Sequence, residues 1–422
     1  MIANTLTILP MLVSVFWLLI LTDDWFLMRS RAKARIAMFA AACTILYSAH
    51  IIYFNHYYAL LPVSDTLYAT AQLSVFPLYA LYIKEVTHDT TKLHWMPIPV
   101  MAATVVTVAI ITGILYALMT PEQTHTFITE YLYHDNTEKL NGIILAQAVI
   151  HKAAHLIFAL QAIFTLIYGA KRIRLHNQQV ADYYADTFGR CVNHPQLTFA
   201  VFIITCILAL TALTIGRHTF CNHPWLLAMP SLSFSTLIFL LCHDAHRMTM
   251  TTFEPQTAIA HLSHSEAMAE NTASTSDDNT VEIHDEEQYT EEANDSSSTS
   301  EGNKGEGTVG TSTIDKLRTK IQQLMEEERL YLQPDLKITD LTERLNTNRD
   351  YTQQAIKRME QGSFSEYINR LRIEHACNLL RNNPKIALID LINACGYSSH
   401  ASFYRNFKQF AGMSPTAYIE KI

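Results

Sequence analysis

The sequence predicts an all-α protein in three parts: a seven-helix transmembrane bundle, a disordered acidic linker, and a carboxyl-terminal all-α domain with two helix-turn-helix units. Three observations support this division. Long apolar runs fill residues 1–247, residues 248–312 are acidic and rich in Ser and Thr, and residues 313–422 have helical periodicity. With 49% hydrophobic and 17% charged residues, the 422-residue chain is more apolar than an ordinary soluble protein.

The first part contains apolar runs long enough to cross a bilayer, which requires about 20 mainly apolar residues. We expect seven spans, at roughly 4–22, 36–56, 66–84, 97–118, 143–168, 197–216 and 224–242. The first run lacks a basic segment before it and a small-residue cleavage site after it. It therefore resembles a retained span more than a cleaved signal peptide.

The basic residues predict an orientation for the bundle. Alternate connections carry Arg29, Arg31, Lys33 and Arg35, then Lys84 and Lys92, then Lys171, Arg172, Arg174 and Arg190, and finally Arg247. The opposite connections carry only Lys139 and Arg217. Because Lys and Arg accumulate on the cytoplasmic side, we expect a multi-pass protein of the bacterial inner membrane, with its amino terminus outside and its terminal domain in the cytoplasm.

Polar residues within the expected spans define a candidate intramembrane polar site. Gln147, His151 and His155 are four residues apart and form one stripe on a helix, and His50 is available from the second span. Interhelical hydrogen bonding is the favoured interpretation, followed by a polar ligand cavity. A metal site is least favoured, because no third or fourth ligand has suitable spacing.

The acidic segment 248–312 predicts disorder, since low hydrophobicity and high net charge cannot offset the entropy cost of folding. A soluble spacer is the favoured interpretation. Two alternatives are competition with nucleic acid for a basic surface and proteolytic release of the terminal domain. After the linker, Ile314, Leu317, Ile321 and Leu324 form an apolar stripe that predicts a helix over 313–332, packed either against its own domain or against a second copy.

Two helix pairs with short turns follow. In the first, a helix over 338–345 precedes a turn at Asn346 and Thr347, and Asn348 is the N-cap of a second helix that reaches about residue 359. In the second, a helix over 386–395 precedes Gly396, and Ser398 or Ser399 caps the next helix. A helix over "FSEYINRLRIEHACNLLRNN" joins the pairs as a rigid spacer. This spacing suits two reading helices that enter successive major grooves.

At these residues the chain resembles a known family. The stretch "LRIEHACNLLRNNPKIALIDLINACGYSSHASFYRNFKQFAGMSP" is similar to the terminal domain of AraC/XylS-type transcription regulators, through Arg372, Ala376, Leu380, Ile389, Ala394, Gly396, Tyr397, Phe403, Phe407, Gly412, Ser414 and Pro415. The segments "NTNRDYTQQAIKRM" and "FSEYINRLRI" resemble the Bacteroidetes-type subset, whose members often join this domain to a multi-span membrane region.

The exposed faces of the two reading helices supply the candidate DNA-binding residues. They are Arg349, Asp350, Gln353, Gln354 and Lys357 in the first pair, and His400, Ala401, Ser402, Arg405 and Gln409 in the second. The resemblance implies base contacts for all of these except Lys357 and Gln409. Three positions depart from the family pattern: Thr352 replaces a usual Leu, Asn346 a frequent Gly, and Ala401 a polar residue.

We therefore expect a membrane-embedded, sequence-specific DNA-binding transcription regulator that responds to a signal through its bundle and needs no cofactor. Its expected partners are promoter DNA, the lipid bilayer, RNA polymerase, a second copy of the chain, and an unknown small-molecule or membrane signal. The alternative is a receptor or transporter whose terminal domain docks a partner. An enzyme is not expected, since phosphate-binding glycine loops and a nucleophile elbow are missing from the sequence.

Overall fold

The computed structural model describes residues 2–88, 97–138, 140–192, 195–215, 219–220, 223–248, 306–360 and 362–422. Over these ranges the protein consists of helices and their connections, with no strand. Most of the expected linker, 249–305, lies outside the described residues. The expected all-helical fold is thus confirmed for the described part of the chain.

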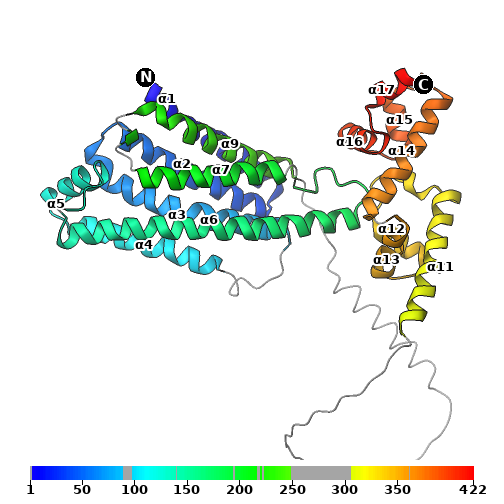
Figure 1. The fold of residues 1–422 in the computed structure, drawn as a ribbon, viewed down its shortest axis with the longest axis horizontal. Coiled ribbons are helices and arrows are strands. Elements are labelled where there is room, and N and C mark those ends of the chain that lie inside the picture. Colours follow the sequence, from blue (N-terminus) through cyan, green and yellow to red (C-terminus); the bar gives the residue numbers. More distant parts are fainter. Residues whose placement is uncertain are drawn as a thin grey trace, which may run out of the picture.

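Seven long helices form the amino-terminal bundle (Figure 1): α1 (Ile2–Met28), α2 (Arg31–Phe54), α3 (Leu61–Val86), α4 (Ile98–Leu118), α6 (Gly142–Tyr183), α7 (Pro195–Ile215) and α9 (Ala228–Arg247). Five of these are long and apolar enough to cross a membrane by length and composition: α1, α2, α4, α6 and α9. Helix α3 is not among them, and α7 contributes the shorter apolar stretch Leu197–Ala209. The expectation of seven spans therefore stays a prediction.

Short helices close the end of the bundle far from the terminal domain. They are η1 (Tyr58–Leu60), α5 (Pro121–Thr126), η3 (Phe127–Leu132) and η4 (Pro224–Leu227). Phe127, which is fully buried, anchors this end together with Tyr131 and Leu132. The Tyr53 hydroxyl donates a hydrogen bond to the Leu132 carbonyl at 2.7 Å, which joins α2 to η3.

A buried lysine ties together three helices at the opposite end of the bundle. The Lys33 ammonium is fully buried, lies 3.2 Å from the Asp24 carboxylate, and donates to the Ala245 and His246 carbonyls at 2.6 and 2.9 Å. These carbonyls belong to the last turn of α9, whose dipole favours a cation. The His246 ring lies 2.9 Å from the same Asp24 carboxylate. Lys33 therefore links α1, α2 and α9.

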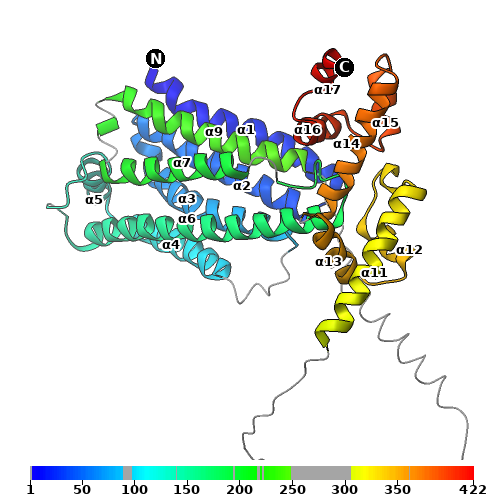
Figure 2. The ribbon, with the colours of Figure 1, turned by 45° about the vertical axis from the view of Figure 1, so that its right-hand side comes forward.

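Helix α6 is longer than the sequence predicted. The expected fifth span ended near residue 168, whereas α6 continues without a proline to Tyr183. The apolar run ends near the expected position, but "AKRIRLHNQQVADY" contains good helix formers and carries the helix onward. Figures 1 and 2 both show this extension reaching the terminal domain.

The terminal domain contains α11 (Glu306–Glu327), η5 (Leu330–Leu332), α12 (Ile338–Leu345), α13 (Arg349–Glu360), α14 (Phe364–Asn382), α15 (Leu388–Ala394), α16 (His400–Ala411) and α17 (Pro415–Lys421). Helix α12 has the predicted bounds, whereas α15 is shorter than the expected 386–395 because Ala387 is in an extended conformation. Helix α11 begins before the expected domain boundary at 313. It ends before 332, because Arg329 adopts a left-handed conformation with φ 50°.

Two hydrophobic clusters stabilise this domain. The first joins Ile314, Leu317 and Ile321 of α11 to buried residues of α12, α13 and the start of α14. The second joins the later part of α14 to Phe403 and Phe407 of α16. The α11 stripe thus packs within its own domain, which supports that interpretation over self-association.

Candidate nucleic-acid interface

Helix α13 has one buried and one exposed face. The Asn348 side chain accepts a hydrogen bond from the Tyr351 amide at 2.9 Å, as predicted for an N-cap. Thr352, Ala355 and Ile356 are buried. The Thr352 hydroxyl donates to the Asn348 carbonyl at 3.1 Å. This buried hydroxyl, which stands where the family resemblance implies Leu, therefore has a hydrogen-bond partner.

Helix α16 has the same division. The Ser399 hydroxyl accepts a hydrogen bond from the Ser402 amide at 3.4 Å, so Ser399 rather than Ser398 is the cap. Phe403 and Phe407 are fully buried. Gly396 adopts φ 73°, and a Cβ atom there would lie 2.3 Å from the Leu332 carbonyl oxygen. Glycine is therefore required at this turn both for its conformation and for space.

Helix α14 is the strut that connects α13 to the α15–α16 pair. Ser363 and Glu366 form a capping box at its start. Arg372, in the middle of α14, is fully buried and donates to the carbonyls of Tyr331 at 2.6 Å and Gln333 at 2.7 Å. Its guanidinium also lies 5.1 Å from the centre of the Tyr397 ring. Arg372 therefore joins both halves of the domain.

The candidate DNA-binding side chains have unequal exposure. Those that are exposed are Asp350, Gln354, Lys357, His400, Ala401, Arg405 and Gln409. Arg349 and Gln353 are half-buried. Ser402, which was expected to face outward, is fully buried, and its hydroxyl contacts a segment from the amino-terminal part of the chain.

This segment, residues 182–190, is called the docking segment below; it begins in the last turn of α6 and continues after that helix. Its first residues contact α13. The Asp182 carboxylate lies 3.4 Å from the Lys357 ammonium, and the Asp182 carbonyl accepts from the Gln353 amide at 3.4 Å. The Arg349 guanidinium lies 5.0 Å from the centre of the Tyr183 ring, within range of a cation–π interaction.

The next residues of the docking segment contact α16. The Ser402 hydroxyl donates to the Asp186 carboxylate at 2.7 Å in a buried environment. Arg405 donates to the Thr187 hydroxyl at 3.4 Å, and its guanidinium lies 5.7 Å from the centre of the Phe188 ring. The docking segment therefore reaches from one reading helix to the other.

Ala185 anchors the middle of the docking segment. Its amide donates to the Leu336 carbonyl at 3.0 Å. Its carbonyl accepts from the Ser365 hydroxyl at 2.8 Å and from the Asn369 amide at 2.7 Å, both on α14. Asn369 in turn accepts from Asn406 of α16 at 3.3 Å. A buried polar network thus connects the docking segment with α14 and α16.

Sequence reasoning missed this segment. Asp182, Asp186 and Asn369 were not among the predicted site residues, because their partners lie far away in the chain. A weak signal was present in "ADYYADTFGRC", where two carboxylates alternate with aromatic residues directly after a long helix.

The expected intramembrane polar residues are only partly brought together. His151 is buried, and its Nε2 atom lies 2.6 Å from the carboxylate of Asp65 on α3, a residue that the sequence analysis did not select. The Tyr116 hydroxyl of α4 donates to the same carboxylate at 2.8 Å. His151 therefore takes part in interhelical hydrogen bonding, the interpretation favoured from the sequence.

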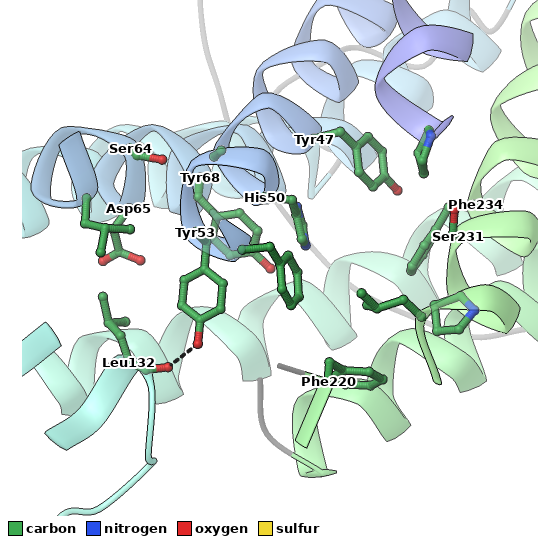
Figure 3. A pocket seen from close by; sticks show the side chains of 16 residues that line it. Tyr47, His50, Tyr53, Ser64, Asp65, Tyr68, Leu132, Phe220, Ser231 and Phe234 are labelled. Carbon is green, nitrogen blue, oxygen red and sulfur yellow. Dashed lines mark hydrogen bonds between the residues drawn. The ribbon is translucent and has the colours of Figure 1, made fainter. Parts of the chain in front are cut away.

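A cavity of about 120 Å³ lies beside this pair, at the end of the bundle far from the terminal domain. Asp65, His50 and the aromatic rings of Tyr47, Tyr68 and Phe234 line it (Figure 3). His50 stacks on Tyr47, with ring centres 5.5 Å apart. Aromatic walls with a few polar groups are typical of small-molecule sites.

The other two residues of the predicted site do not line this cavity. Gln147 is fully buried, and within the described part of the chain its side-chain amide has no hydrogen-bond partner. His155 is half-buried, one turn further along α6. In the described residues, no group of three or more His, Cys, Asp or Glu side chains is arranged to hold a metal ion.

Comparisons with known proteins identify the terminal domain. Residues 341–421 match the family model described as a helix-turn-helix domain. The Msm operon regulatory protein of Streptococcus mutans is 30% identical over 87 residues, which are 21% of this chain and 31% of that protein. The Melibiose operon regulatory protein of Escherichia coli K12 is 32% identical over 83 residues, which are 20% of this chain and 27% of that protein.

The chain thus matches less than a third of the length of these two regulators. Among solved structures, the C-terminal domain of AraT, a response regulator from Geobacillus stearothermophilus, is 26% identical. The match covers 26% of this chain and 84% of that one, with a TM-score of 0.23. Taken together, the family match and the regulator relatives identify the carboxyl-terminal part of this chain as a helix-turn-helix domain of the AraC type.

Proposed function

We propose that the protein is a membrane-embedded transcription regulator that binds promoter DNA sequence-specifically through two helix-turn-helix units, α12–α13 and α15–α16. The observation that carries this proposal is the placement of α13 and α16. One short segment of chain contacts both helices, so their polar faces lie on the same side of the α14 strut. Two such helices can enter neighbouring major grooves on one face of a duplex.

The side chains on this shared face suit DNA. Arg349 and Gln353 on α13, together with Arg405 on α16, can contact base edges, while Lys357 suits a phosphate. We include RNA polymerase and a homodimer among the proposed partners, as expected from the sequence. The names of the two relatives described above, both operon regulatory proteins, support this reading.

The surface of the bundle supports insertion into a bilayer. Large apolar side chains are exposed along several helices, among them Leu19, Leu27, Val106, Ile110, Leu156 and Ile167. Arg172, Arg190 and Arg247 lie toward the end that faces the terminal domain, where Arg247 contacts Phe188 of the docking segment. We propose that this end faces the cytoplasm, in keeping with the positive-inside rule.

We also propose that the bundle receives the signal. The cavity next to Asp65 is our proposed input site, because it combines aromatic walls with a buried hydrogen-bonded pair, Asp65 and His151, that joins α3 to α6. A ligand or lipid that changes this pair would act directly on α6, the helix that carries the docking segment.

Genome-wide crosslinking of tagged full-length protein to DNA tests the proposed function. We expect discrete peaks that disappear in Arg349→Ala/Arg405→Ala. In a matched control, Arg381→Ala, the peaks should persist, because Arg381 is exposed on the last turn of α14 and contacts Asn378. Peaks that are insensitive to the double substitution would remove these residues from the interface. A map without peaks under varied growth conditions would favour a receptor or transporter instead.

A further inference from the structure

We propose that the docking segment is an interaction surface for the DNA-reading face of the terminal domain, so that the docking segment and DNA are alternative occupants of that face. This inference rests on the proposed function, since it assigns a second ligand to the same residues. The ligand is a part of this chain, residues 182–190. While the docking segment occupies that face, as it does in this structure, the terminal domain is held at the end of the bundle that we propose faces the cytoplasm.

The docking segment contacts the same side chains that we expect to contact DNA. Arg349, Gln353 and Lys357 of α13 and Ser402 and Arg405 of α16 all contact the docking segment. These five residues come from both reading helices and belong to the candidate DNA-binding set. Because the docking segment lies against this face of both helices, a duplex that contacts the same five side chains has to occupy the same space.

The docking segment also resembles DNA in the negative charge that it offers. DNA offers negative phosphate oxygens and, in the grooves between them, the polar edges of its bases, and half or more of the protein hydrogen bonds go to phosphate and sugar. The docking segment offers the Asp182 and Asp186 carboxylates to a Lys357 ammonium and a Ser402 hydroxyl. It also places the rings of Tyr183 and Phe188 beside the guanidinium groups of Arg349 and Arg405.

The contact is strong at its centre and weak at its rim. At the centre, Asp186 and Ala185 are buried and make hydrogen bonds of 2.7–3.0 Å. At the rim, the contacts of Lys357, Gln353 and Arg405 are 3.4 Å long. A small displacement breaks the rim contacts first and releases the Lys357 and Arg405 side chains from the docking segment, which lets DNA compete for the rest.

The energetic consequence follows from competition within one molecule. A protein whose binding-competent state is only partly populated has its apparent affinity reduced by that fraction. Weakening the docked state must therefore tighten DNA binding without any change to the DNA-contacting side chains. Asp182 and Asp186 are suitable positions, because neither is among the candidate DNA-binding residues.

The first test compares full-length variants in lipid nanodiscs, with a fluorescent 40-base-pair duplex of mixed sequence as the probe. We expect Asp182→Ala/Asp186→Ala to bind about tenfold more tightly than the unmodified protein. The control, Asp23→Ala/Glu326→Ala, removes the same charge from two exposed positions outside the docking segment. Its affinity should equal that of the unmodified protein, which separates undocking from a general loss of negative charge.

The second test follows the Ala185 amide by hydrogen exchange in the unmodified full-length protein. This amide is bonded to the Leu336 carbonyl across the contact. We expect slow exchange without DNA and at least tenfold faster exchange when the duplex is saturating. Faster exchange in Asp182→Ala/Asp186→Ala without DNA would support the same inference.

The outcomes separate the two proposals. If the duplex binds with equal affinity to all three forms and the Ala185 amide stays protected, the alternative-occupant inference is wrong while DNA binding stands. If no form binds the duplex, even at low salt, the proposed function fails and the inference fails with it.

Discussion

Arg372 is the residue on which the geometry of the terminal domain depends. Burial lowers the pKa of its guanidinium, yet arginine stays charged inside proteins, so the site must hold a cation. The carbonyls of Tyr331 and Gln333 and the face of Tyr397 provide that environment.

We predict that Arg372→Ala destabilises the terminal domain by about 3 kcal/mol or more, because buried carbonyls lose their charged donor and a cavity forms. Hydrogen exchange of α14 amides in the full-length protein measures this. Arg381→Ala on the same helix is the matched control, with an expected cost below about 0.5 kcal/mol. Equal protection in the two variants would contradict the role given to Arg372.

Two glycines allow the cost of a left-handed backbone conformation to be separated from the cost of a steric clash. Gly396 and Gly412 have nearly the same φ, 73° and 76°, but only at Gly396 would a Cβ atom meet a neighbour, the Leu332 carbonyl oxygen. We predict that Gly412→Ala costs about 1 kcal/mol and Gly396→Ala clearly more. Exchange rates of α16 amides in the full-length protein provide the comparison, and equal costs would show that the close approach is relieved elsewhere.

Cys191, directly after the docking segment, reports on docking. Burial raises the pKa of its thiol to about 11, so at pH 8 its thiolate fraction is on the order of a hundredfold below that of a free thiol. We predict faster maleimide labelling in Asp182→Ala/Asp186→Ala, by up to that factor, measured by peptide mass spectrometry. Cys377 in the terminal domain is the internal control, and its labelling rate should not change. An unchanged rate at Cys191 would mean that its burial comes from local contacts alone.

At the scale of elements, the Lys33 contacts hold α1, α2 and α9 together. We predict that Lys33→Met destabilises the bundle by about 3–5 kcal/mol, since it leaves Asp24 and two carbonyls of α9 without their cation. Lys33→Met/Asp24→Asn should recover part of this loss, because the buried carboxylate is also removed. The measurement is thermal unfolding of the purified full-length protein in detergent; a double variant less stable than the single one would contradict the pairing.

The helices themselves were largely predictable, because their signals are local. The short helix expected over 338–345, the cap at Asn348 and the cap at Ser398 or Ser399 correspond to α12, α13 and α16, with Ser399 as the actual cap of α16. The extension of α6 was not predicted, because the apolar run ends near residue 168 and the helix continues in polar sequence. Periodicity also selected His151 but not its partner Asp65, which lies 86 residues away.

At the scale of the whole molecule, the contact between bundle and terminal domain was not predictable from sequence patterns. Its hydrogen bonds join residues separated by 151 to 218 positions, from Ala185–Leu336 to Thr187–Arg405. Such pairs leave no periodic or spacing signal in one sequence. The burial of Ser402 is the clearest example, because its helix position alone predicted an exposed side chain.

Helix α6 has a mechanical consequence for this arrangement. With 42 residues it is about 63 Å long, and His151 and Asp182 lie about 46 Å apart on it. A continuous helix without proline behaves as a stiff lever. If it pivots near the midpoint between these residues, a tilt of about 5° moves each by about 2 Å. Travel of that size at Asp182 is enough to break the 3.4 Å contact with Lys357. A movement no larger than a bond length or two beside the cavity would thus be carried along α6 to the terminal domain.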